Sequence, residues 1–149
     1  MPEKATLKRA AKDKEEGKSA STQAGEFVHE EMDHIREGKH GARSAKQAIA
    51  IGLSKARRAG VKLAPPKKAS AETRHKAAQD SAKGRAGKKA VSTTRSRATS
   101  KALKKEGHSA ASPRALSQHA KSAAAKRTAA ERSASARKAA RTRAREAES

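Results

Sequence analysis

The chain has 149 residues, with one Phe, no Trp, no Tyr and no Cys, and carries a formal net charge of +22. This length allows about one domain, but the composition argues against a single compact core, because most of the hydrophobic residues are alanine. The missing cysteines exclude disulfides and thiolate metal sites, and no apolar run is long enough to span a membrane.

The positive charge is concentrated after residue 40. Residues 1–40 hold 8 Lys and Arg against 9 Asp and Glu, which gives −1, whereas residues 41–149 hold 29 against 6, which gives +23. Such a charge density repels itself and attracts a polyanion. Lipid is a poorer partner than nucleic acid, because this region has almost no large apolar side chains to insert into a membrane. We therefore expect a cytoplasmic, nucleoid-associated protein.

Residues 1–23 are expected to form a flexible, charged segment with at most a short helix. A helix is predicted over 24–37, because Val28, Met32 and Ile35 recur at helical spacing and define one apolar face. Acidic residues recur on the opposite side of this helix, and we expect them to point to solvent and to compete with nucleic acid for the basic residues downstream. This acidic stripe consists of Glu26, Glu30, Asp33 and Glu37.

A second helix is predicted over 45–59. Ser44 is a suitable N-cap, and Gln47 follows three residues later, as in a capping box. Gly60 comes directly after the last turn, where a glycine commonly ends a helix. One face of this helix is a seam of small residues that allows close approach, and the short connection between the two helices makes them antiparallel.

These patterns predict an all-α fold: a small hairpin of two antiparallel helices over 24–63, followed by a Lys/Ala/Gly/Ser linker over 64–94 and a basic, Ala-rich arm over 95–149. The predicted hairpin core is Phe27, Val28, Met32, Ile35, Ile49 and Leu53. A hairpin of this size buries little surface, so a homodimer formed through it is a natural extension.

The arm is expected to be largely disordered or only partly helical. After Pro65 the large aliphatic residues are Val91, Leu103 and Leu116, too few to offset the entropy of ordering the chain. Helical character is predicted near 94–106 and in an uninterrupted run from Pro113, with more helix once phosphates neutralise the charge.

We expect this arm to bind nucleic acid without base specificity, with DNA favoured over RNA, because phosphate contacts need only Lys and Arg. The lack of aromatic residues argues against stacking on exposed bases. The residues expected to bind are Lys67, Lys68, Arg85, Lys88, Lys89, Arg95, Arg97, Lys101, Lys104, Lys105, Arg114, Lys121, Lys126, Arg127, Arg132, Arg137, Lys138, Arg141, Arg143 and Arg145.

Two alternatives stay open. The hairpin could dock a protein partner while the arm supplies solubility, or the chain could associate with RNA or the ribosome. A sequence-reading helix-turn-helix is disfavoured, because the turn is longer than that motif uses and no third core helix is evident.

No enzyme, cofactor or metal site is predicted. His29 and His34 are five residues apart, about 140° round a helix, whereas the metalloprotease pattern needs two His at i,i+4 on one face. Glu30 and His34 could share an ion weakly, but no third ligand is evident. The segment 84–89 lacks the spacing of a phosphate-binding loop, and no nucleophile–base pair can be argued.

The segment Ser44–Gly60, which ends in KQAIAIGLSKARRAG, resembles the helix signature of a family of small basic bacterial proteins of unknown function. In that family a helix similar to Val28–Lys39 precedes it, so the resemblance covers about Phe27–Val61. The family implies no established activity. The Ala/Lys-rich tail is similar in composition to the tails of linker histones and bacterial histone-like proteins, which implies DNA binding.

Overall fold

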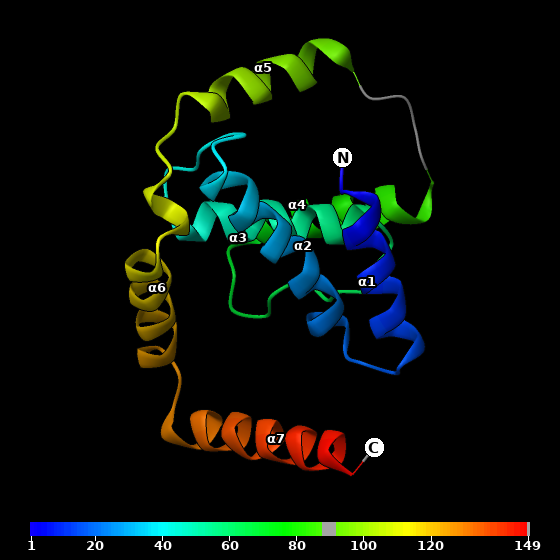
Figure 1. The fold of residues 1–149 in the computed structure, drawn as a ribbon, viewed down its shortest axis with the longest axis vertical. Coiled ribbons are helices and arrows are strands. Elements are labelled where there is room, and N and C mark those ends of the chain that lie inside the picture. Colours follow the sequence, from blue (N-terminus) through cyan, green and yellow to red (C-terminus); the bar gives the residue numbers. More distant parts are fainter. Residues whose placement is uncertain (88–91, 149) are drawn as a thin grey trace. The chain divides into compact units, whose positions relative to one another are not determined.

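The computed structural model describes residues 1–87 and 92–148. Within them it contains seven α-helices, one short 3-10 helix and no strand (Figure 1). The elements are α1 (Lys4–Glu15), α2 (Ala20–Arg36), α3 (Ala45–Arg58), α4 (Ala71–Arg85), α5 (Thr93–Lys104), η1 (Ser109–Ala111), α6 (Pro113–Ala125) and α7 (Ala129–Ala147). None of the helices in the described ranges is long and apolar enough to cross a membrane.

The predicted helical character is confirmed, but the predicted two-helix hairpin with a largely disordered arm is wrong. The chain forms two compact units, one over Met1–Ser112 and one that begins at Pro113. In the first unit α1 packs on α2, α4 packs on α3, and η1 contacts both α2 and α3. The α2–α3 pair is thus the centre of a larger helical domain.

The α2–α3 contact is built from small residues. Gly52 faces Val28 so closely that a Cβ at Gly52 would lie 2.7 Å from the Val28 Cα. Ala48 and Ala56, one turn to either side of Gly52, are fully buried. The large buried side chains come from α2, where Phe27 and Ile35 are almost completely covered. The seam of small residues therefore brings the two backbones together around the apolar face of α2.

The predicted core residues divide into two groups. Phe27, Met32 and Ile35 are buried, whereas Val28, Ile49 and Leu53 are half-buried. Leu53 packs on a cluster that includes Ala10 of α1.

The acidic stripe of α2 points to solvent only in part, because α1 covers Glu30 and part of Glu26, whereas Glu37 is exposed as predicted. Glu30 is only 3% exposed and accepts the backbone N–H of Glu3 at 3.1 Å. Glu26 is half-buried and pairs with Arg9 of α1. Glu26 and Glu30, which were predicted to face solvent, instead make polar contacts between α1 and α2.

Helix α4 lies where a linker was predicted. Its buried residues are Ala77 and Asp80, too few for an apolar periodicity. Asp80 instead accepts hydrogen bonds from Ser54 at 2.6 Å and Arg58 at 2.7 Å, both on α3. Gly84 then touches the end of α3, where an added Cβ would lie 2.2 Å from the Arg57 carbonyl oxygen. Polar bonds and one close backbone contact hold α4 in place.

The predicted ends of α3 are confirmed. The Ser44 hydroxyl accepts the N–H of Gln47 at 3.2 Å, although the Gln47 side chain accepts from the N–H of Arg43 rather than from that of Ser44. Gly60 adopts a φ of 95°, and the Val61 N–H reaches the Ala56 carbonyl at 3.1 Å. This is the hydrogen bond of a Schellman motif, which needs a residue that tolerates positive φ.

In the second unit the helix predicted to run on from Pro113 is interrupted at residues 126–128. Thr128 and Glu131 form a reciprocal capping box that starts α7 as a separate helix. Arg127 donates to the Glu131 carbonyl at 2.8 Å, and Arg132 donates back to the Arg127 carbonyl at 2.8 Å. The signal for this break was a Thr-x-x-Glu pattern, and no glycine or proline lies at the break.

The close α2–α3 contact predicts that a larger residue at Gly52 destabilises the fold. Gly52→Ala is expected to lower the free energy of unfolding by about 1–3 kcal/mol, because the new Cβ overlaps the α2 backbone. The control is Gly25→Ala, on the exposed side of α2 with nothing within 4 Å, which should be neutral or stabilising by up to about 1 kcal/mol. Urea unfolding followed by circular dichroism measures both, and equal effects would contradict the close contact.

Candidate nucleic-acid interface

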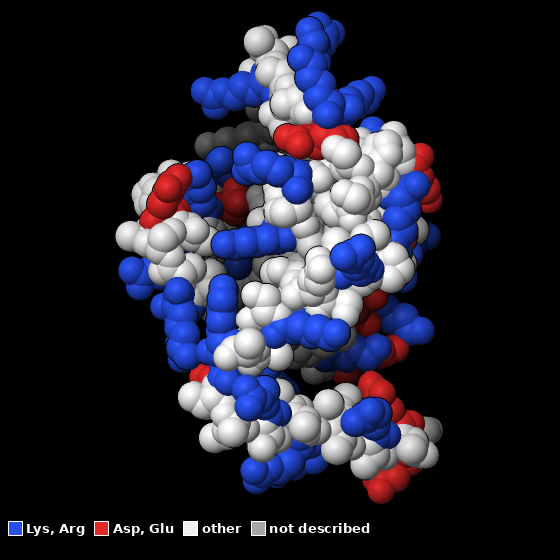
Figure 2. Space-filling view, turned by 90° about the vertical axis from the view of Figure 1, so that its left-hand side faces the viewer, with Lys and Arg blue, Asp and Glu red and all other residues white. Residues whose placement is uncertain are grey.

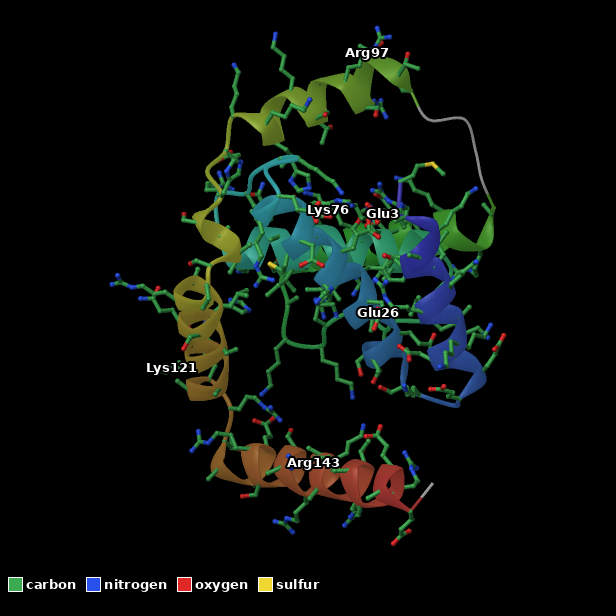
Figure 3. All side chains as sticks on the ribbon, in the orientation of Figure 1. Glu3, Glu26, Lys76, Arg97, Lys121 and Arg143 are labelled. Carbon is green, nitrogen blue, oxygen red and sulfur yellow. The ribbon has the colours of Figure 1, made fainter. Side chains whose placement is uncertain are left out.

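The predicted binding residues all lie at the surface wherever the structure describes them. Lys88 and Lys89 fall outside the described residues, and the other eighteen are exposed. Figure 3 labels one on each of three helices: Arg97 on α5, Lys121 on α6 and Arg143 on α7. Figure 2 shows one face of the molecule, where Lys and Arg side chains project in many places and Asp and Glu are fewer.

Helix α5 and the residue after it carry a group of these cations on one side. We call the α5 patch the four basic residues Arg97, Lys101, Lys104 and Lys105, which with Ser96 and Ser100 line one shallow depression. At 3.6 residues per turn the four cations fall within an arc of roughly 100°. None of the twelve residues of α5, all of them described, is buried. One side of this helix therefore presents four positive charges and two hydroxyls to solvent.

The C-terminal end of α5 is hydrogen-bonded to the connection between α2 and α3. The carbonyl oxygens of Leu103 and Gly107 accept the N–H groups of Gly41 and Ala42 at 2.9 and 3.0 Å. A Cβ at Gly41 would lie 2.0 Å from the Glu106 carbonyl oxygen, so this approach requires glycine. Three of the four patch residues lie next to this attachment.

The following segment strengthens the attachment. Ala110 and Ala111 of η1 are buried against α2 and α3, and Arg36 of α2 donates to the Ala111 carbonyl at 3.1 Å. The α5 patch is therefore carried on a helix whose last turn has a defined place in the domain.

Most acidic groups in the first unit are already paired. Ten of the eleven Asp and Glu residues in the described range 1–80 form an ion pair. Hydrogen bonds from His34 and then Lys39 hold the pKa of the Glu3 carboxyl below its usual value, so it stays ionised at neutral pH. Beyond Asp80 the sequence has four acidic residues and nineteen Lys and Arg.

The second unit adds a long basic helix. The described part of α7 contains six Lys and Arg, all exposed, against Glu131 and Glu146. Arg132, one of these six, and Arg127, which precedes α7, are engaged in backbone contacts at the α6–α7 corner.

Sequence reasoning identified the cations but not their arrangement. The i,i+4 spacing of Arg97, Lys101 and Lys105 was a usable signal for the α5 patch. The attachment of α5 could not be predicted, because it depends on backbone groups of Gly41 and Ala42 that carry no sequence pattern.

Residues 13–68 match a protein family described as a family of unknown function (DUF6496). The matched span runs from the last turn of α1 through α2 and α3 to the segment before α4. It supports the predicted relation to an uncharacterised family. No match was found among curated proteins or solved structures.

The attachment of α5 can be tested at Gly41. Gly41→Ala is expected to release the 103–107 segment, because the added Cβ overlaps the Glu106 carbonyl. Hydrogen exchange at the amides of residues 41 and 42 should then be faster by about tenfold or more, the loss of roughly one backbone hydrogen bond. The control is Gly107→Ala in the partner segment, where nothing lies within 4 Å of the new Cβ. Slow exchange in both variants would contradict the attachment.

Proposed function

We propose that the chain is a non-enzymatic protein that binds duplex nucleic acid with little sequence preference, DNA in preference to RNA, through the exposed Lys and Arg residues of α5, α6 and α7. One observation carries the proposal. The acidic residues are largely engaged in ion pairs before residue 81, whereas the predicted binding cations that follow are exposed. The basic charge is therefore available to an external polyanion.

The chemistry of the surface favours phosphates over bases. Binding through Lys and Arg releases counterions from the nucleic acid, which supplies affinity without sequence information. Stacking on bases would need exposed aromatic side chains. The one Phe, Phe27, is only 1% exposed, and the chain has no Trp or Tyr.

The α5 patch fits a run of phosphates. Residues four apart on a helix are separated by about 6 Å along its axis, which lets neighbouring cations reach successive phosphates of one strand. The hydroxyls of Ser96 and Ser100 can donate to phosphate oxygens in the same depression. Lys101 and Lys104 also stabilise the C-terminal end of α5, so their charges serve the helix as well as the ligand.

The preference for DNA follows from the resemblance of the tail to histone-like proteins, and compaction or protection of DNA is the role that this chemistry supports. Docking of a protein partner gains no specific support from the α2–α3 face, because α1, α4 and η1 cover much of it.

The proposal predicts a steep dependence on salt. A labelled 30-base-pair DNA duplex is titrated with the full chain at several salt concentrations, and anisotropy gives the dissociation constant. The variant Arg97→Gln/Lys101→Gln/Lys104→Gln/Lys105→Gln should flatten the log–log salt slope by up to about 3.6, at about 0.9 per lost phosphate contact. Changing the DNA sequence should leave the affinity nearly unchanged.

The matched control removes the same charge from α1 and α3. Lys4, Lys8, Lys14 and Lys46 are exposed, and their replacement by Gln should change the slope by less than one. An equal loss in both variants would assign binding to overall charge and contradict a role for the α5 patch. No binding of the full chain at low salt would overturn the proposed function. Tighter binding to an RNA duplex than to the DNA duplex would contradict the proposed preference for DNA.

A further inference from the structure

A cluster of titratable side chains lies inside the first unit, at the end of α2 and in the connection to α3. Glu31 and His34 come from α2, and His40 comes from the connection to α3. One carboxylate oxygen of Glu31 and one ring nitrogen of each histidine lie within 4.8 Å of one another. The Glu31 side chain is 1% exposed, and those of His34 and His40 are 13% and 15% exposed.

We propose that Glu31, His34 and His40 form a binding site for one divalent transition-metal ion, with Zn²⁺ as the best-fitting ion. Two imidazole nitrogens and one carboxylate oxygen are a donor set that suits Zn²⁺ and its neighbours Co²⁺ and Ni²⁺. A fourth position remains for water.

The hydrogen bonding of His40 supports a metal. Its Nδ1 lies 3.1 Å from the carbonyl oxygen of Gly41, which can only accept, so Nδ1 carries the proton in the neutral ring. Its other nitrogen, Nε2, then has a free lone pair and lies 3.0 Å from Glu31 Oε1. In the neutral ring two acceptors therefore face each other, and either a second ring proton or a metal ion can lie between them.

The spacing fits such a cation. Ligand atoms at about 2.0–2.2 Å from a tetrahedral Zn²⁺ ion are separated by about 3.3–3.6 Å, so Glu31 Oε1 and His40 Nε2, which lie 3.0 Å apart, need to move apart by only a few tenths of an ångström. The Glu31 carboxylate is fully buried, and neither oxygen has a hydrogen bond of good geometry among the described residues. A metal ion would satisfy this carboxylate.

His34 also has the support that metal-binding histidines commonly have. Its Nε2 lies 2.8 Å from Glu3 Oε1, and Lys39 lies 3.2 Å from the same oxygen. A carboxylate that accepts from one ring nitrogen orients the imidazole and makes the other nitrogen a better ligand. Glu3 comes from the start of α1, so the site would connect α1, α2 and the α2–α3 connection.

Lys55 of α3 opposes the metal. Its ammonium nitrogen lies 2.5 Å from Glu31 Oε2 and 3.5 Å from Glu30 Oε1. This charge balances Glu31 when the site holds no metal and repels an incoming cation. Because Lys55 contacts Oε2, the oxygen that faces His40 remains available.

The sequence indicated neither the third ligand nor the correct acid. The expected weak pair was Glu30 with His34, but Glu30 is bound by α1, and it is Glu31 that lies beside the two histidines. His40 joins them because Gly38, at a φ of 74°, turns the chain back over the end of α2.

The test uses the full chain, freed of metal by a chelator, with Zn²⁺ alone as the ligand. Isothermal titration should give one site per chain, and bound Co²⁺ should show the visible absorption of a tetrahedral nitrogen–oxygen site. His34→Gln and His40→Gln should each weaken Zn²⁺ binding by about tenfold or more. His29→Gln is the control, because His29 is exposed and pairs with Asp33 outside the cluster.

Lys55→Met should raise the affinity for Zn²⁺, because it removes the competing charge. The two histidine variants keep the buried ion pair of Glu31 with Lys55, so they test the site even if Glu31→Gln fails to fold. Absence of saturable binding at one ion per chain would overturn the proposal. The proposal would also be overturned if His34→Gln and His40→Gln bound Zn²⁺ as tightly as His29→Gln does.

Discussion

The first unit depends on two adjacent buried carboxylates of α2. Glu30 and Glu31 are 3% and 0% exposed, and an ionised carboxylate is costly to bury without partners. For Glu30, burial raises the pKa, but hydrogen bonds from Thr6 and the Glu3 backbone, together with the charge of Lys55, lower it below the usual value. The partners of this acidic pair come from α1, α3 and the α2–α3 connection. Each of these elements must dock for α2 to be stable where it lies.

Close backbone contacts take the place of large apolar side chains in this domain. Gly52 brings α3 onto α2, Gly84 brings α4 onto the end of α3, and Gly41 receives the segment after α5. A chain with one Phe and much Ala gains packing by shortening the distance between backbones, since alanine and glycine have little side-chain surface to bury. Ion pairs and hydrogen bonds between helices supply the specificity that interlocking side chains supply in richer cores.

This kind of packing decides what the sequence could predict. The limits of α3 followed from Ser44 and Gly60, and the apolar face of α2 followed from Met32 and Ile35, because caps and hydrophobic spacing are local signals. The docking of α1 and α4 was missed because it rests on polar pairs such as Asp80 with Arg58, which look like solvated surface in a sequence. The composition alone predicted the basic character of the candidate interface. The fixed end of α5 and the place of His40 depend on backbone contacts and a turn, which leave no pattern in the residues.

The cations that pair with buried acids are not among those proposed to bind nucleic acid. The basic residues that pair with buried or half-buried acids, such as Lys18, Lys55 and Arg58, precede residue 81. From residue 93 on, fifteen Lys and Arg accompany four acidic residues, so few carboxylates remain to neutralise them. Of the acidic stripe of α2, Glu26 and Glu30 are held by α1 and α3, whereas Asp33 and Glu37 pair with cations of α2 and of the connection that follows it. The acid-rich residues 1–40 thus carry almost no net charge, and the later helices are the source of positive potential.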